Sequence, residues 1–158
     1  MIDPTKIYDH FEKNKGVYKK TLDRVSLKKA IPFLEEFTET AYQKNNCLEC
    51  AGCCKNYSPR FKAPDIKRIS KYIGMKETEM MDKFLHRDDE GDYVLNEKPC
   101  TFLNQDNTCS IYEVRPSDCA RFPYTDEDVF LKRKDLTIKN ASFCVIAQHV
   151  LERLKDVK

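Results

Sequence analysis

The sequence has no tryptophan, only four glycines and no apolar run of the length that a bilayer requires. A membrane-spanning helix needs about 20 predominantly apolar residues, so we expect no membrane insertion. The chain also shows no internal repeat and no low-complexity segment. These absences exclude solenoid, fibrous and linker-rich proteins.

An excess of charge of one sign is missing as well. The chain has 28 Lys and Arg residues against 26 Asp and Glu residues, which gives a net charge of +2. Nucleic-acid-binding domains carry a basic patch or are strongly basic overall. Here the lysine pairs alternate with acidic residues, a pattern typical of solvated helix faces. We therefore expect no nucleic-acid partner.

The first six residues lack the basic-then-apolar order of a secretory signal peptide. This predicts a cytoplasmic protein, in a reducing compartment where disulfides are rare. The chain nevertheless contains eight cysteines among its 158 residues. In a secreted protein that number would indicate disulfides, whereas in the cytoplasm metal ligation explains it better.

The spacing of the first four cysteines is the most informative pattern. Cys47, Cys50 and Cys53 are separated by two residues each, and Cys54 follows directly. A two-residue spacer lets both sulfurs of a pair reach one metal ion. Neighbouring side chains diverge on a helix or strand, so Cys53 and Cys54 are expected to serve different positions. Gly52 is expected to give the backbone freedom to turn before this pair.

Four later cysteines complete the candidate set. Cys100, Cys109 and Cys119 fall in turns or at the ends of elements, where loops can hold ligands on a scaffold. Cys144 begins an amphipathic segment and could instead be a small buried hydrophobic residue. The candidate metal ligands are Cys47, Cys50, Cys53, Cys54, Cys100, Cys109, Cys119 and Cys144. They could form two four-sulfur sites, or one site with spare cysteines.

Zinc and iron both suit these ligands, because soft thiolates bind zinc and iron–sulfur clusters alike. The Cys-Pro that closes the bacterial ferredoxin run is missing. A second Cys-x-x-Cys pair, common in zinc sites, is missing too. The three histidines, His10, His86 and His149, are scattered and show no ligand spacing. The expected cofactor is therefore zinc or iron, with an iron–sulfur cluster included.

Apolar periodicity predicts a mainly α fold with a small β element: a compact helical domain whose cysteine-cluster metal site is built from loops. Helices are expected around residues 27–41, 63–74, 78–86 and 142–155, and strands at residues 93–95 and 101–103. Ser26 is expected to cap the helix of residues 27–41, and Pro32 to kink or break it.

We expect residues 1–44 to be an N-terminal helical arm packed on a metal-binding domain of residues 45–158. The arm carries no cysteine. Its helices are therefore scaffold, or a surface through which a protein partner could bind.

Residues 45–147 resemble the YkgJ-type cysteine-cluster family, CxxCxxCC, which is described as a zinc- or iron-chelating domain. The resemblance rests on Cys47-x-x-Cys50-x-x-Cys53-Cys54, on Pro-Cys-Thr-Phe-Leu at residues 99–103, and on residues 109–119 and 121–123. The family commonly has a basic residue directly after the cysteine that matches Cys119. Here Ala120 intervenes before Arg121.

The resemblance implies a protein that chelates zinc or iron through clustered thiolates. Arg115 and Arg121 flank Cys119 and are expected to offset the negative charge of those thiolates. A similar cysteine motif occurs in flagellin lysine methylases. The alternative function is therefore a redox or methyl-transfer enzyme component that uses the metal centre, although the chain has no Gly-x-Gly nucleotide fingerprint.

Overall fold

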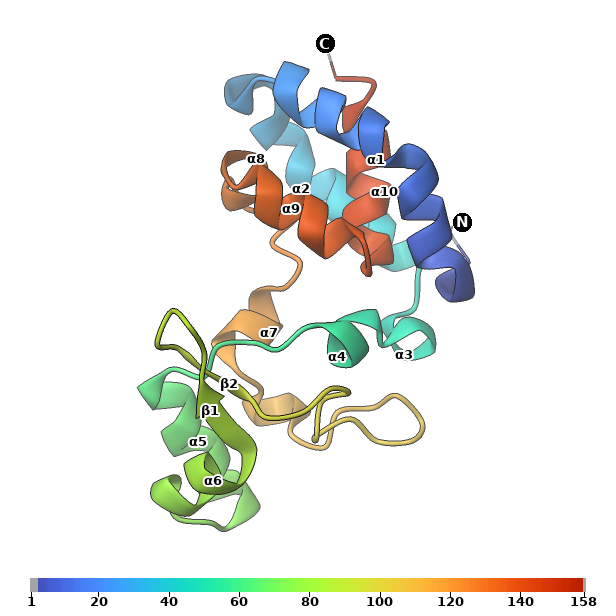
Figure 1. Ribbon diagram of the computed structural model, residues 1–158. Helices are drawn as coiled ribbons and strands as arrows, with labels where there is room; N and C mark the ends of the chain where they lie inside the picture. The colour runs from blue at the N-terminus through green and yellow to red at the C-terminus, as the bar shows by residue number, and fades with distance from the viewer. Residues whose placement is uncertain (1–2, 158) are drawn as a thin grey trace. The chain divides into compact units, whose positions relative to one another are not determined.

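The computed structural model describes residues 3–157, which are mostly helical with one two-stranded sheet (Figure 1). This confirms the prediction of a mainly α fold with a small β element. The chain forms two units: a terminal unit of Met1–Cys50 with Pro123–Lys158, and a central unit of Ala51–Phe122. The expected division at residue 45 into an arm and a metal-binding domain stays a prediction. Within the described residues, no helix is both long and apolar enough to cross a membrane.

The terminal unit is a helical bundle. Its elements are η1 (Pro4–Lys6), α1 (Ile7–Arg24), α2 (Leu27–Lys44), α3 (Cys47–Cys50), α8 (Val129–Lys132), α9 (Lys134–Ala141) and α10 (Val145–Leu154). Helix α10 packs against α1, α2 and α9 (Figure 1). Its apolar residues Ile146, Val150 and Leu154 are fully buried, so α10 is the centre of this bundle.

The start and the buried stripe of α2 follow the sequence pattern. The Ser26 side chain accepts a hydrogen bond from the Lys29 amide and caps the helix, as predicted. Ala30 and Leu34 lie on the buried face. The helix is continuous through Pro32, so the predicted break is wrong. Proline near the start of a helix removes a single backbone hydrogen bond, and packing on α10 offsets that loss.

The central unit contains α4 (Gly52–Asn56), α5 (Ala63–Ile73), α6 (Glu77–Phe84), β1 (Leu85–Arg87), β2 (Tyr93–Leu95), η2 (Tyr112–Val114) and α7 (Ser117–Arg121). Strands β1 and β2 are antiparallel, with Leu85 opposite Leu95. A compact apolar cluster forms its core: Phe61, Ile66, Ile69, Met80, Leu85, Leu95, Phe102 and Ile111.

Helix α5 confirms the expected segment of residues 63–74. Ile66 and Ile69 are buried on one face, and Gly74 ends the helix in the left-handed conformation with φ 71°. The next helix ends at Phe84 rather than residue 86, because Leu85 starts β1 and buries its side chain against the core.

Two expected elements differ from the structure. Residues 101–103 form no strand; Leu103 alone makes an isolated antiparallel bridge, to Cys109, around the turn of residues 104–108. The last helix begins at Val145 rather than residue 142, because α9 runs up to Ala141 and the chain turns before α10. Helix α9 was not expected, since its charged sequence carries little apolar periodicity.

Candidate metal site

The Cys-x-x-Cys-x-x-Cys-Cys segment forms two short helical turns. Cys47 and Cys50 are the first and last residues of α3, so their side chains lie on one face of that turn. Ala51 then adopts a left-handed conformation with φ 46°, and Gly52 begins α4. The predicted turning point before the cysteine pair therefore exists, but it falls on Ala51, where a residue with a Cβ is uncommon.

Three cysteines belong to the terminal unit. Cys47 is exposed, Cys50 is half-buried, and Cys144 is only 7% exposed at the residue before α10. Burial, with smaller contributions from the Cys50 and Cys47 thiols, raises the pKa of the Cys144 thiol to about 12. Cys144 is thus buried and also lies near the first two cysteines. Both of its interpretations from the sequence, as a small buried residue and as a metal ligand, are compatible with this position.

The other five cysteines belong to the central unit, and backbone hydrogen bonds connect their segments. The Cys100 amide donates to the Cys54 carbonyl at 2.8 Å, which joins the turn after Pro99 to α4. The Leu103 amide donates to the Cys100 carbonyl at 3.0 Å, and Leu103 forms the bridge to Cys109. Cys119 lies on α7. Four separate segments therefore bring Cys54, Cys100, Cys109 and Cys119 into one part of the unit.

Electrostatics confirms that these four thiols are neighbours. Burial, with smaller contributions from nearby Cys54 and Cys109, raises the pKa of Cys100 to about 11. Burial also raises the pKa of Cys119, with additional contributions from Cys100, Cys54 and Cys109. Adjacent thiolates repel one another, and a bound cation is the natural way to hold several of them ionised at once.

Cys53 and Cys54 are adjacent in space as well as in sequence. Their sulfur atoms lie 3.9 Å apart in a hydrogen bond. The hydrogen bond with Cys53 lowers the pKa of Cys54 to about 7; burial opposes the shift and Lys55 assists it. Two sulfurs on a tetrahedral zinc ion are about 3.8 Å apart, given a Zn–S distance of about 2.3 Å. This spacing therefore also fits a shared ion.

The donor set fits a soft metal, although the thiols do not converge on one point. Among the described residues, no three or more His, Cys, Asp and Glu side chains form a ready-made ion site. Thiolate sites commonly close together with the metal, because binding releases the thiol protons that otherwise keep the ligands apart. Cys54, Cys100, Cys109 and Cys119 are the residues that could hold zinc or iron in the central unit.

Arg115 acts on this region as expected from its position. Its guanidinium stacks 3.9 Å over the Tyr112 ring and donates to the Tyr112 carbonyl at 2.8 Å. Its positive charge lowers the pKa of Cys109, against the larger effect of burial, which raises it. Arg121 is exposed at the end of α7, and its predicted support of the thiolates stays a prediction.

The histidines have other roles where the structure shows partners. His10 Nδ1 is 2.7 Å from Gln148 Oε1, and Gln148 is fully buried at the centre of the terminal unit. The Gln148 amide nitrogen donates to the Ile7 and Ala141 carbonyls, so this network joins α1 and α9 to α10. His86 Nδ1 is 3.2 Å from Asn96 Oδ1.

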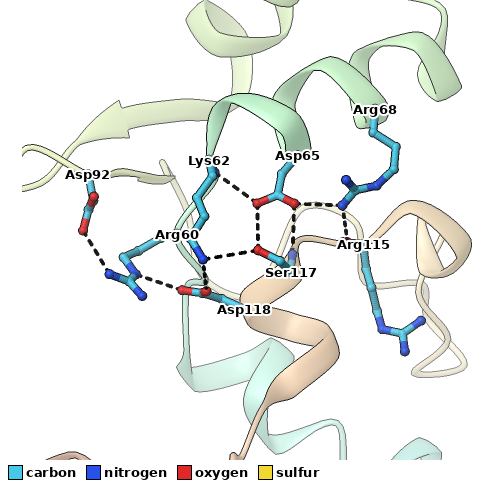
Figure 2. Close-up of polar contacts among 8 residues, drawn as sticks. All are labelled: Arg60, Lys62, Asp65, Arg68, Asp92, Arg115, Ser117 and Asp118. Atoms are coloured by element: carbon cyan, nitrogen blue, oxygen red, sulfur yellow. Dashed lines mark hydrogen bonds and ion pairs between the residues drawn. The ribbon is translucent and has the colours of Figure 1, made fainter.

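Two buried acids of the central unit, Asp65 and Asp118, were not among the site residues expected from the sequence. Asp65 is 2% exposed and Asp118 is 1% exposed. Figure 2 shows both within a network of Arg60, Lys62, Arg68 and Ser117. Two features of the sequence point to this network: Asp118 directly precedes Cys119, and cationic residues cluster before Asp65.

This arrangement is a cysteine-rich, metal-chelating type of domain. Residues 46–145 match the family model CxxCxxCC, whose description is "Putative zinc- or iron-chelating domain". The chain belongs to this family. No curated protein and no solved structure matches it.

Proposed function

We propose that the protein chelates zinc or iron through two sets of cysteines, one in each unit. The central set is Cys54, Cys100, Cys109 and Cys119. The observation that supports the proposal is the approach of four separate segments in the central unit: the Cys100 amide donates to the Cys54 carbonyl at 2.8 Å, and Leu103 bridges to Cys109. Four thiolates fill the coordination of a structural zinc ion and equally suit an iron–sulfur cluster.

The terminal set is Cys47, Cys50 and Cys144. Three thiolates leave a fourth coordination position for water or for a ligand from outside. Cys47 is exposed, so an ion held by this set would be accessible for exchange. These features support a chelating or delivering role for the terminal set and a closed, structural role for the central one. An open position would also allow a substrate to bind the metal, as the alternative role in methyl-transfer chemistry would need.

Metal chelation by thiolates requires reduced cysteines. Cys54, Cys100, Cys109, Cys119 and Cys144 are thiols in the structure. We infer that the protein works in a reducing compartment such as the cytoplasm, where thiols persist.

The proposal is tested on the full chain purified without oxygen. Bound zinc, bound iron and acid-labile sulfide are measured per chain, first in the wild type. Zinc without sulfide would identify a mononuclear site, and iron with sulfide a cluster. Cys109→Ser is expected to lose the metal of the central set, because a serine hydroxyl does not replace a thiolate on a soft metal.

The matched control is Ser110→Ala, next to Cys109. It removes a hydroxyl that donates to the Phe102 carbonyl at 3.2 Å but takes away no thiol. Its metal content should equal that of the wild type. A wild-type chain that binds neither metal, or a Cys109→Ser variant with undiminished metal content, would refute the proposal.

A further inference from the structure

Residues 114–118, which precede Cys119, form hydrogen bonds and ion pairs with charged residues of the segment 60–68. Asp65, in the first turn of α5, accepts two hydrogen bonds from Ser117: the amide donates to Oδ1 at 3.1 Å and the hydroxyl to Oδ2 at 3.2 Å (Figure 2). The same carboxylate accepts from Arg68 Nη2 at 2.8 Å and from the Lys62 amide at 3.1 Å. These four donor groups, from Ser117, Arg68 and Lys62, satisfy the carboxylate of Asp65, which is almost wholly buried.

Asp118 provides the second attachment point. Its Oδ2 accepts from Arg60 Nε at 2.8 Å, and its Oδ1 accepts from Lys62 Nζ at 3.0 Å. Lys62 Nζ is also 3.4 Å from the Ser117 hydroxyl, so one lysine contacts two consecutive residues of α7 (Figure 2). Arg60 also reaches Asp92, at 3.8 Å, which marks the outer edge of the network.

Arg68 extends the attachment toward Cys109. Its guanidinium donates to the Arg115 carbonyl at 2.9 Å and to the Val114 carbonyl at 3.3 Å. Backbone or side-chain groups of residues 114, 115, 117 and 118 are therefore all bound to the segment of residues 60–68. This stretch lies between Cys109 and Cys119 in the sequence, so its position constrains where both thiols can go.

We propose that Asp65 and Asp118 are positioning residues for the central cysteine set: they hold residues 114–118 against α5 so that Cys119 faces Cys54, Cys100 and Cys109. The inference rests on the proposed function of that set. Burying two carboxylates is costly unless each is fully paired. Here both are paired, and their bonds with Ser117, Arg60 and Lys62 join residues 117 and 118 to the segment of residues 60–65.

Asp118 could act on Cys119 in two ways, by fixing its position or through its own negative charge. The Asp118 carboxylate directly precedes Cys119, and its negative charge would repel a thiolate there. If charge decided the outcome, neutralising Asp118 would strengthen metal binding. If position decides, the same change weakens it. The two roles predict opposite signs for one substitution.

The experiment uses the reduced, metal-free full chain titrated with Co²⁺, whose sulfur-to-cobalt charge-transfer band reports the thiolates bound. Competition with a chelator of known affinity gives the dissociation constant. Asp118→Asn and Asp65→Asn are expected to weaken Co²⁺ binding at the central set by about tenfold or more, the size of effect typical for groups that orient metal ligands. The charge-transfer intensity per bound ion should fall as Cys119 is lost from the site.

The matched control is Asp92→Asn, which removes an acid at the outer edge of the same network. Its side chain is 41% exposed and contacts only the Arg60 end, so binding should stay within about twofold of the wild type. Asp118→Glu keeps the charge and should recover part of the lost affinity. Lys62→Met removes the amine that donates to Asp118 and should also weaken Co²⁺ binding. This variant tests the proposal if Asp118→Asn does not fold.

Two failures are distinguishable. A wild-type chain without a thiolate charge-transfer band would refute the proposed metal function itself. A wild type that binds Co²⁺ through thiolates, together with Asp118→Asn and Lys62→Met variants that bind as tightly or more tightly, would overturn the positioning role alone.

Discussion

Cys53 and Cys54 show how two adjacent thiols can differ within one short helix. Their sulfurs are 3.9 Å apart and share a hydrogen bond. This bond with Cys53 lowers the pKa of Cys54 to about 7, so the Cys54 thiol ionises near neutral pH. A thiolate is the form that binds a metal and reacts with electrophiles, so Cys54 is the cysteine of the central set prepared to bind first.

This difference predicts the order of alkylation in the reduced, metal-free chain. Cys54 should react with iodoacetamide with a midpoint near pH 7, whereas Cys100, with a pKa of about 11, should react only in alkaline solution. Peptide mass spectrometry over a pH series measures both. Cys53→Ala should move the Cys54 midpoint upward, since the donor that stabilises the thiolate is gone. An unchanged midpoint would show that the Cys53 thiol does not act on Cys54.

Ionisation of Cys54 and of Cys100 changes the stability of the fold in opposite directions as the pH rises. The pKa of Cys54 is lower in the folded chain than its ordinary value of 9.0, so its contribution is present above that value and lost as the pH falls through about 7. The pKa of Cys100 is higher in the folded chain. Its contribution is present below 9.0 and lost as the pH rises through about 11.

Two glycines in α-helical segments have opposite conformational requirements. Gly16 lies inside α1, and a Cβ added there would meet no atom within 4 Å. Gly74 ends α5 with φ 71°, a conformation that residues with a Cβ adopt at a cost. Both positions have open space around them, so backbone conformation alone distinguishes them.

Alanine at these glycines should therefore change helix stability in opposite directions. Gly16→Ala should stabilise α1 by about 0.5–1 kcal/mol, because alanine loses less backbone entropy on folding. Gly74→Ala should destabilise the end of α5 by about 1–2 kcal/mol. Hydrogen exchange of the amides in each helix measures both changes. Gly74→Asn is the control, since asparagine tolerates the left-handed region; stabilisation by Gly74→Ala would contradict the argument.

Elements with strong local signals could be predicted from the sequence. The cap at Ser26 and the end of α5 at Gly74 are decided within a few residues, and both were predicted correctly. Helix α9 lacks that periodicity and depends on packing against α1 and α10. The left-handed residue is Ala51 rather than Gly52, because the two helical turns around it fix the backbone there.

The candidate site divides in the same way. Spacing singled out Cys47, Cys50 and Cys53, since Cys-x-x-Cys is a local pattern, whereas the other five cysteines were candidates by residue type alone. The grouping of Cys54 with Cys100, Cys109 and Cys119 depends on hydrogen bonds between distant segments, which spacing does not encode. The burial of Asp65 and Asp118 depends on α7 meeting α5, so a residue that looks like a helix cap also became the anchor of a network.

At the scale of the whole molecule, the two units differ in how much apolar material supports them. The terminal unit buries large side chains from four helices, among them Tyr18, Leu34, Ile146, Leu151 and Leu154. The central unit has a smaller cluster around Ile69 and Met80. Units of roughly 70 residues rarely obtain enough stability from such a core alone and often add a metal or disulfides. We expect a metal held by the proposed set of Cys54, Cys100, Cys109 and Cys119 to supply this support.

Metal removal should therefore loosen the central unit far more than the terminal unit. Apparent binding energies of structural zinc sites reach about 10–16 kcal/mol, comparable with the whole stability of a small domain. After chelation, we expect amides of α5 and β1 to lose most of their protection from hydrogen exchange. Amides of α1, α2 and α10 should keep theirs, because the apolar core of the terminal unit supports these helices.

Hydrogen exchange followed by mass spectrometry compares the chain as purified with the chelated chain, peptide by peptide. Cys109→Ser is the control: it should show low protection in α5 and β1 before chelation and little further change afterwards. Equal loss in both units would mean that the metal supports the whole molecule rather than the central unit. Full protection of α5 in the chelated chain would show instead that the core around Ile69 is sufficient, and that the thiolates serve the metal rather than the fold.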